Sequence, residues 1–199
     1  MAHASKATLA ATLWPTSTNS LTRGVVIAIV GALLLTLAAK VKVPFYPVEM
    51  TMQTPVLVAL ALALGWRLAL ATVLLYLAQG AAGLPVFTGT PEKGIGLVYM
   101  MGATGGYLLG FALAAIAVGR LADAGWGRGA FSSLATALVG LALIYVPGVI
   151  WLAYLIGFEK AMLFGFWPFI AKDLVGTAVA ALGVTAVWQL AERWRRPAA

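Results

Sequence analysis

Long apolar stretches, nearly free of charged residues, alternate with short charged segments along the whole chain. A helix needs ~17–25 residues to cross a bilayer, and six of these stretches are close to that length or above it. The pattern therefore predicts an all-α membrane protein built from a bundle of transmembrane helices. The six expected helices span residues 22–40, 50–65, 67–83, 98–119, 131–152 and 169–191.

The composition supports this class. Apolar residues make up 62% of the 199 residues and charged residues only 10%, whereas a soluble domain has roughly 45–50% and about 25%. Too little polar sequence is left to cover a water-facing surface, so the chain is expected to be an integral membrane protein. The absence of cysteine excludes disulfides, zinc–thiolate sites and cysteine nucleophiles.

The positions of the charges predict the orientation. An even number of helices puts both termini on one side, and positively charged residues accumulate in cytoplasmic segments. With the termini inside, every arginine falls on the inner side, and the outer links carry lysines mixed with acidic residues. We therefore expect a multi-pass protein of the cell (inner) membrane. Its six-helix domain, residues 22–192, is expected between a flexible cytoplasmic N-terminal tail, residues 1–21, and a basic cytoplasmic C-terminal tail, residues 193–199.

The chain lacks the residues that intramembrane enzymes need. Its one histidine, His3, lies in the N-terminal tail, and Asp123 falls in a cytoplasmic loop, so Asp173 has no carboxylate partner in the membrane. No Gly-Lys pair exists to form a phosphate-binding loop. We expect neither an enzyme nor a metal or cofactor site. An intramembrane enzyme remains the alternative from a different functional class.

The second helix begins unusually. Thr54 and Pro55 are typical of a helix start, but a helix beginning there would be too short to cross the membrane. Either the helix starts near Met50, or Val43–Gln53 enters the membrane as irregular chain, which survives only where it lines a cavity or is buried in protein. Both alternatives put Thr51 and Gln53 at the outer mouth of a cavity.

Polar side chains gather on the same outer side. Asp173 is the most informative, because a carboxylate inside a membrane helix is costly and usually marks a site or pathway. It could instead cap the helix start or pair with Lys172. Trp167, with its aromatic neighbours, could form an interfacial belt or the wall of a pocket. The other polar candidates are Tyr76, Gln79 and Lys93.

Small residues recur at helical spacing in two of the expected helices. Gly24, Ala28 and Ala32 share one face of the first helix. Gly102, Gly106, Gly110 and Ala114 share one face of the fourth. Such stripes let helix backbones approach closely. Packing within the protein is the default for the fourth helix, whereas the first stripe could equally dock a partner protein.

Three segments resemble the BioY family: VPFYPVEMTMQTPVLVAL (43–60), LLYLAQGAAGLPVFTGTPEKGIG (74–96) and GATGGYLLGF (102–111). The resemblance implies a six-helix biotin-binding S component of an energy-coupling factor vitamin transporter, with its site facing outward. It also implies partnership with a transmembrane T component and two ABC-type ATPase subunits, although some members are thought to act without them. An S component for another vitamin is the nearest alternative.

The resemblance also implies roles for particular residues. Ala28 and Ala32 match the motif with which S components dock on the T component. Thr51 and Gln53, Tyr76, and Asp173 match segments of the second, third and sixth helices, and Gly83–Phe87 matches a lid-like loop. The chain departs from the family pattern at Ala103, where many members have proline, and at Gly176, where a lysine is common.

Chemical complementarity with biotin then suggests individual contacts. Asp173 suits the N–H groups of the ureido ring, and Gln53 or Gln79 suits the ureido oxygen. Lys93 suits the tail carboxylate, with Lys172 as the second candidate. The apolar ring edges would pack on three aromatic residues, Tyr46, Tyr76 and Trp167.

Overall fold

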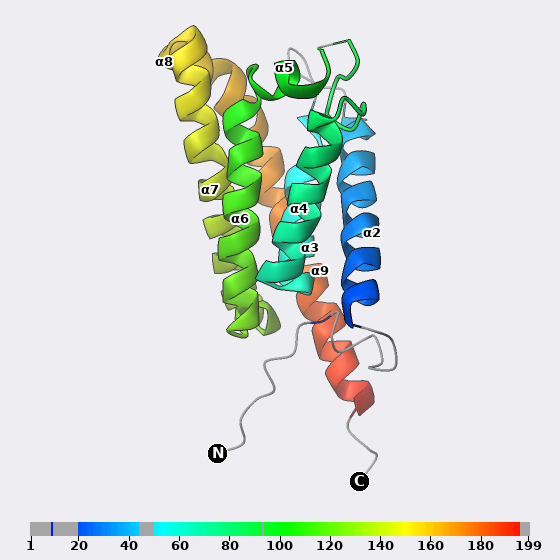
Figure 1. Ribbon diagram of the computed structural model, residues 1–199. Helices are drawn as coiled ribbons and strands as arrows, with labels where there is room; N and C mark the ends of the chain where they lie inside the picture. The colour runs from blue at the N-terminus through cyan, green and yellow to red at the C-terminus, as the bar shows by residue number, and fades with distance from the viewer. Residues whose placement is uncertain (1–8, 10–19, 44–49, 93, 196–199) are drawn as a thin grey trace.

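The computed structural model describes residue 9 and residues 20–43, 50–92 and 94–195 as a bundle of long helices lying side by side (Figure 1). α2 begins and α9 ends at the same end of the bundle, and the short helices α5 and α8 lie at the other end. The long helices are α2 (Ser20–Lys40), α3 (Gln53–Leu64), α4 (Trp66–Ala81), α6 (Gly105–Asp123), α7 (Ala130–Ile156) and α9 (Trp167–Arg195).

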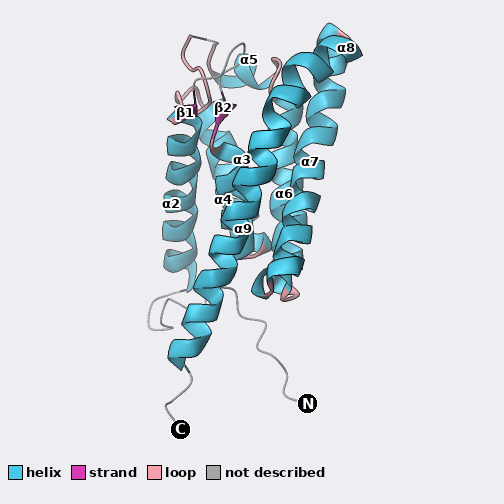
Figure 2. Cartoon of the chain, turned by 180° about the vertical axis from the view of Figure 1, so that it is seen from behind, coloured by secondary structure: helices cyan, strands magenta, loops and turns pink. Residues whose placement is uncertain are grey.

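Short elements complete the described chain. Two short antiparallel strands, β1 (Lys42–Val43) and β2 (Met50–Thr51), pair between α2 and α3 at the end that carries α5 (Figure 2). The other short elements are α5 (Gly96–Met100), the 3-10 turn η1 (Trp126–Arg128), α8 (Phe158–Ala161) and the π-helical turn η2 (Met162–Phe166).

The predicted number of bundle helices is confirmed, but their lengths differ. Among the described residues, four helical segments are long and apolar enough to cross a membrane: Leu21–Lys40, Gly105–Asp123, Ala130–Ile156 and Phe158–Trp194. α3 and α4 have only 12 and 16 residues. At 1.5 Å per residue α3 is about 18 Å long, well short of a ~30 Å hydrocarbon core.

The start of α3 creates the hollow in the bundle. The helix begins at Gln53 and not near Met50, because the chain before it forms strand β2. α3 lies in the middle of the bundle, where it packs against α9, α6 and α2. Because this central helix begins only at Gln53, space is left before its first turn, and longer neighbouring helices enclose that space.

Other predicted boundaries also differ from the structure. The fourth helix, expected over 98–119, is divided into α5 and α6 by a turn at residues 101–104. The outer link expected over 153–168 is largely helical, because α7 continues to Ile156 and only Gly157, with φ of 87°, interrupts the helix before α8. At the C-terminal end, α9 runs past residue 192 into the predicted tail.

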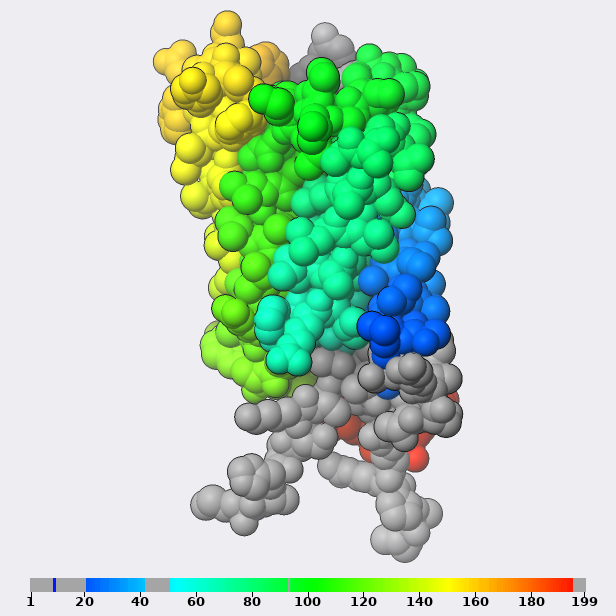
Figure 3. Space-filling model, viewed as in Figure 1, coloured from blue at the N-terminus to red at the C-terminus, as the bar shows by residue number. Residues whose placement is uncertain are grey.

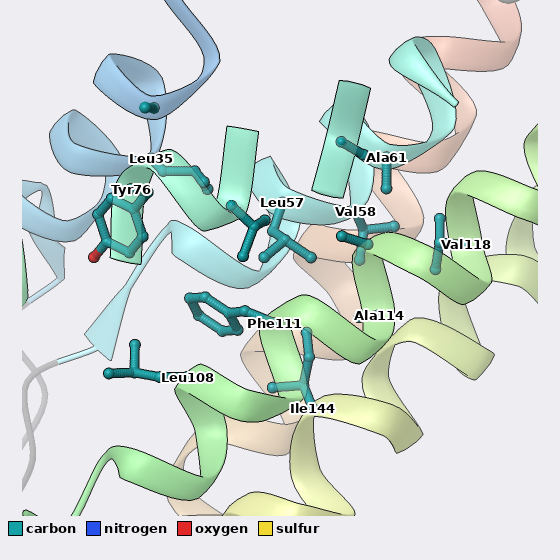
Figure 4. Packing of buried hydrophobic residues seen from close by; sticks show 14 of the residues in the cluster. Leu35, Leu57, Val58, Ala61, Tyr76, Leu108, Phe111, Ala114, Val118 and Ile144 are labelled. Atoms are coloured by element: carbon teal, nitrogen blue, oxygen red, sulfur yellow. The ribbon is translucent and has the colours of Figure 1, made fainter. Parts of the chain in front are cut away.

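The glycine stripe of the fourth helix packs inside the protein, as predicted. A Cβ at Gly110 would lie 2.7 Å from Ile144 Cα, and one at Gly106 would overlap the backbone of α7. Above and below this contact the core is filled by Leu57, Val58, Phe111 and other apolar side chains from several helices (Figure 4). The absence of side chains at the glycines lets α6 and α7 approach closely.

The stripe of the first helix also packs inside the described bundle, and docking of a partner at this motif stays a prediction. Ala28 is 8% exposed and Ala32 is completely buried. Between them, a Cβ at Gly31 would lie 2.6 Å from the Thr72 side chain of α4. α2 and α4 lie against each other on the face shown in Figure 3. These alanines therefore lie in the contact between α2 and its neighbours.

Candidate functional site

A cavity of about 510 Å³ opens at the end of the bundle that carries α5. Its walls come from the start of α3, from α4, from the turn between α5 and α6, and from α6, α7, η2 and α9. Residues far apart in sequence, such as Thr51 and Asp173, meet here because α3 begins at Gln53, beside α9. The lining is mostly aromatic and aliphatic, with a few polar groups, which is typical of small-molecule sites. The aromatic lining residues are Tyr76, Phe87, Tyr99, Tyr107, Phe111, Tyr145, Phe164 and Phe169.

An ion pair lies in the wall formed by α9. Lys172 Nζ is 2.6 Å from Asp173 Oδ1. Tyr145 donates a 2.7 Å hydrogen bond from α7 to Asp173 Oδ2, and Lys172 also donates to the carbonyl of Thr51. Asp173 is only 4% exposed. Residues of α7, α9 and β2 thus meet at this ion pair.

One oxygen of this carboxylate can accept a further hydrogen bond. Asp173 Oδ1 is buried and ion-paired with the ammonium of Lys172, and among the described residues no second donor reaches it. A carboxylate oxygen can accept more than one hydrogen bond, so a second donor can bind here. The arrangement is therefore suited to a ligand that brings an N–H group.

A second polar network fixes the opposite wall. Gln53 Nε2 donates to Tyr76 OH at 2.7 Å, and Thr88 Oγ1 donates to Gln53 Oε1 at 2.9 Å. Tyr99 of α5 donates to the Thr88 carbonyl at 2.8 Å. Burial raises the pKa of Tyr99 above its usual value of 10.0, so its hydroxyl stays protonated at neutral pH. One N–H of the Gln53 amide is not used in this network.

Five predicted residues line the cavity, and two do not. Gln79 is half-buried on α4, where Phe87 forms the cavity wall by packing on the neighbouring Gly80. Trp167 is 62% exposed and contacts the edge of Phe166. Tyr46 and Lys93 lie outside the described residues. The predicted residues that the structure brings together are Thr51, Gln53, Tyr76, Lys172 and Asp173.

Helix phase explains the error at Trp167. Residues four apart share a helix face, so Phe169 lies on the side of Asp173 and lines the cavity. Trp167 precedes Asp173 by six residues and therefore faces away. The i, i+4 spacing was available in the sequence and would have favoured Phe169.

Sequence reasoning also missed Tyr145 and Tyr107. Tyr145 holds Asp173, and Tyr107 donates a 2.8 Å hydrogen bond to the carbonyl of Gly165 in η2. The two rings meet edge to face with centroids 6.0 Å apart. The available signal was weak: each is a hydroxyl-bearing residue inside a long apolar helix.

Comparison with known proteins identifies the family. The model of the BioY family matches residues 6–193. The chain belongs to the BioY family. It is 38% identical over 149 residues to the probable biotin transporter BioY of Pyrococcus horikoshii, covering 75% of this chain and 86% of the relative. It is also 38% identical over 151 residues to the biotin transporter BioY of Thermotoga maritima, covering 75% and 86%.

A solved structure supports the fold. The crystal structure of the S-component for biotin from an ECF-type ABC transporter matches with a TM-score of 0.71 and 19% identity, covering 88% of this chain and 95% of that one. At this identity the likeness shows the fold. This BioY family chain therefore has the S-component fold.

The departure at Gly176 has a packing reason. A Cβ at this position would lie 2.7 Å from Cγ of Pro55, where α9 crosses α3. A lysine here would have to push the two helices apart. Among the described residues, the cation beside Asp173 is Lys172.

Proposed function

We propose that this chain is the biotin-binding S component of an energy-coupling factor transporter. The observation that carries the proposal is the ion pair between Lys172 and the buried Asp173 in the wall of a largely apolar cavity, in a chain of the BioY family. Relatives that cover most of its length carry the name biotin transporter. A cavity of about 510 Å³ falls within the range of ~300–1,000 Å³ that is common for small-molecule sites.

The ion pair suits the ureido group of biotin. That group presents a carbonyl oxygen directly beside an N–H. Lys172 Nζ is a donor and Asp173 Oδ1 an acceptor, and they lie 2.6 Å apart. The pair can therefore donate to the ureido oxygen and accept from the neighbouring N–H. The unused N–H of Gln53 is a second donor for the oxygen.

The tail carboxylate of biotin needs a separate cation. Lys172 and Asp173 are too close together to hold opposite ends of an extended ligand. Lys93 therefore stays the first candidate for the carboxylate on sequence grounds. The apolar part of the rings would pack on Tyr76, Phe111 and Phe169, which take the place of Trp167 in this role.

We also propose both termini in the cytoplasm, with the cavity facing outward. The distribution of arginines supports this orientation. The proposed partners are a transmembrane T component and two ABC-type ATPases, because the chain carries no phosphate-binding loop of its own. The family motif at Ala28 and Ala32 of α2 is the proposed docking site of the T component.

Equilibrium binding to the purified chain tests the function. Tritiated biotin should bind with a stoichiometry of about one, and unlabelled biotin should displace it while riboflavin and thiamine do not. Preferential binding of another vitamin would make the chain an S component for that vitamin. Absence of binding to any of them would contradict the proposal and reopen the intramembrane-enzyme alternative.

A further inference from the structure

The segment from Val86 to Thr90 is fixed from several sides, although it carries no regular secondary structure. Tyr76 of α4 donates to the carbonyl of Val86. Tyr99 of α5 donates to the carbonyl of Thr88, and the Thr88 hydroxyl is bound to Gln53 of α3. We name residues 86–90 the wall segment.

Lys40 holds the same segment from α2. Its ammonium donates to the Phe87 carbonyl at 2.9 Å, and to the carbonyl and the hydroxyl of Thr90 at 3.1 Å each. Lys40 is the last residue of α2, so the contact ties the end of that helix to the segment. A single cation thus joins both ends of a four-residue turn. Hydrogen bonds from a charged donor are stronger than those between neutral groups.

The wall segment shapes the cavity through Phe87. The ring of Phe87 stacks on Tyr99 with centroids 4.9 Å apart and meets the edge of Tyr76 at 5.3 Å. It also packs against Gly80, where any side chain would overlap the ring. Phe87 and Thr88 both line the cavity. The position of the turn that Lys40 holds therefore decides where this wall stands.

We infer that Lys40 is a positioning residue of the ligand site: it clamps the wall segment so that Phe87 and Thr88 are in place before ligand arrives. The inference rests on the proposed function only in taking biotin as the ligand. The sequence places Lys40 at the outer end of the first expected helix. In the structure its contacts are with backbone carbonyls of the pocket wall. A wall that is fixed beforehand loses less conformational freedom when ligand binds, so the bound state is more stable. Differences in affinity of this kind appear mainly in the dissociation rate.

Thiol labelling tests the clamp without ligand. The chain has no cysteine, so Val86→Cys introduces a single reporter at a side chain that is 8% exposed. Lys40→Met should speed its reaction with a maleimide roughly tenfold, since about 1.4 kcal/mol corresponds to tenfold, and Lys40→Arg should restore the slow rate. Lys160→Met, which removes an exposed lysine of α8, should leave the rate unchanged.

A second reporter separates local release from loss of the fold. Ala161→Cys lies at a completely buried position of α8, and its labelling should stay slow in the Lys40→Met background. Equal acceleration at both reporters, or none at Val86→Cys, overturns the clamp.

Biotin kinetics then test the positioning role. Lys40→Met should raise the dissociation rate of biotin roughly tenfold and leave the association rate nearly unchanged, with Lys40→Arg close to the parent. An unchanged dissociation rate overturns the positioning role. If the parent chain itself binds no biotin, the proposed function fails, while the labelling result still decides whether Lys40 clamps the wall.

Discussion

At the residue scale, the site depends on a charge that is costly to bury. An ionised carboxylate inside a membrane protein is tolerated when a partner and hydrogen bonds compensate it. Asp173 has both, in Lys172 and Tyr145. Apart from the ion pair with Lys172, no donor of the described chain reaches its Oδ1. A ligand N–H would complete this environment.

Two ligands and two variants test which end of biotin this pair binds. Asp173→Asn and Lys172→Met should each weaken both biotin and biotin amide by roughly ten- to a hundredfold, as expected for charge-assisted hydrogen bonds of ~1.5–3 kcal/mol. Lys93→Met should weaken biotin and spare the amide, which has no tail charge. Lys160→Met serves as the matched control. If Lys172→Met spares the amide, Lys172 binds the carboxylate and the ureido assignment is wrong.

The same scale shows what sequence can reveal about a site. Asp173 and Lys172 stand out because charge is rare within an apolar helix. Tyr145 and Phe111 do not, because an aromatic residue fits lipid, packing and a pocket equally well. Trp167 was misassigned because its helix phase, and not its residue type, decides whether it reaches the cavity.

At the element scale, apolar length predicted six helices, whereas their interruptions had weaker signals. The turn at residues 101–104 between α5 and α6 contains neither proline nor charge. The π-helical turn η2 is likewise continuous with apolar sequence. Backbone breaks of this kind depend on packing against neighbouring helices, which a charge pattern does not record.

The glycine contacts between helices yield a matched pair of substitutions. Gly110→Ala should lower the free energy of unfolding by about 1–3 kcal/mol, because its Cβ would press on the α7 backbone. Gly183→Ala in α9 meets nothing within 4 Å and should raise it by roughly 0.5–1 kcal/mol, because alanine favours the helix. Thermal unfolding in detergent measures both. Equal effects would show that α6 and α7 do not pack this closely.

At the scale of the whole molecule, the cavity follows from the length of one central helix. α3 is short and lies between α9 and α6, so residues separated by more than a hundred positions meet above it. Sequence placed Thr51, Gln53 and Asp173 on the same side of the membrane. It did not predict that Lys172 would bind the carbonyl of Thr51, because the neighbours of each helix are set by tertiary packing.

The central claim is that this cavity binds biotin from outside the cell. The most direct measurement is labelling of Ala103→Cys, an exposed residue that lines the cavity, with an impermeant maleimide in vesicles of known orientation. The reagent should react from the outer side, and biotin should slow the reaction. Ala124→Cys, exposed after α6 at the opposite end, should react only from the inner side, at a rate that biotin does not change. Reaction of Ala103→Cys from the inner side alone, or a rate unaffected by saturating biotin, would contradict the account.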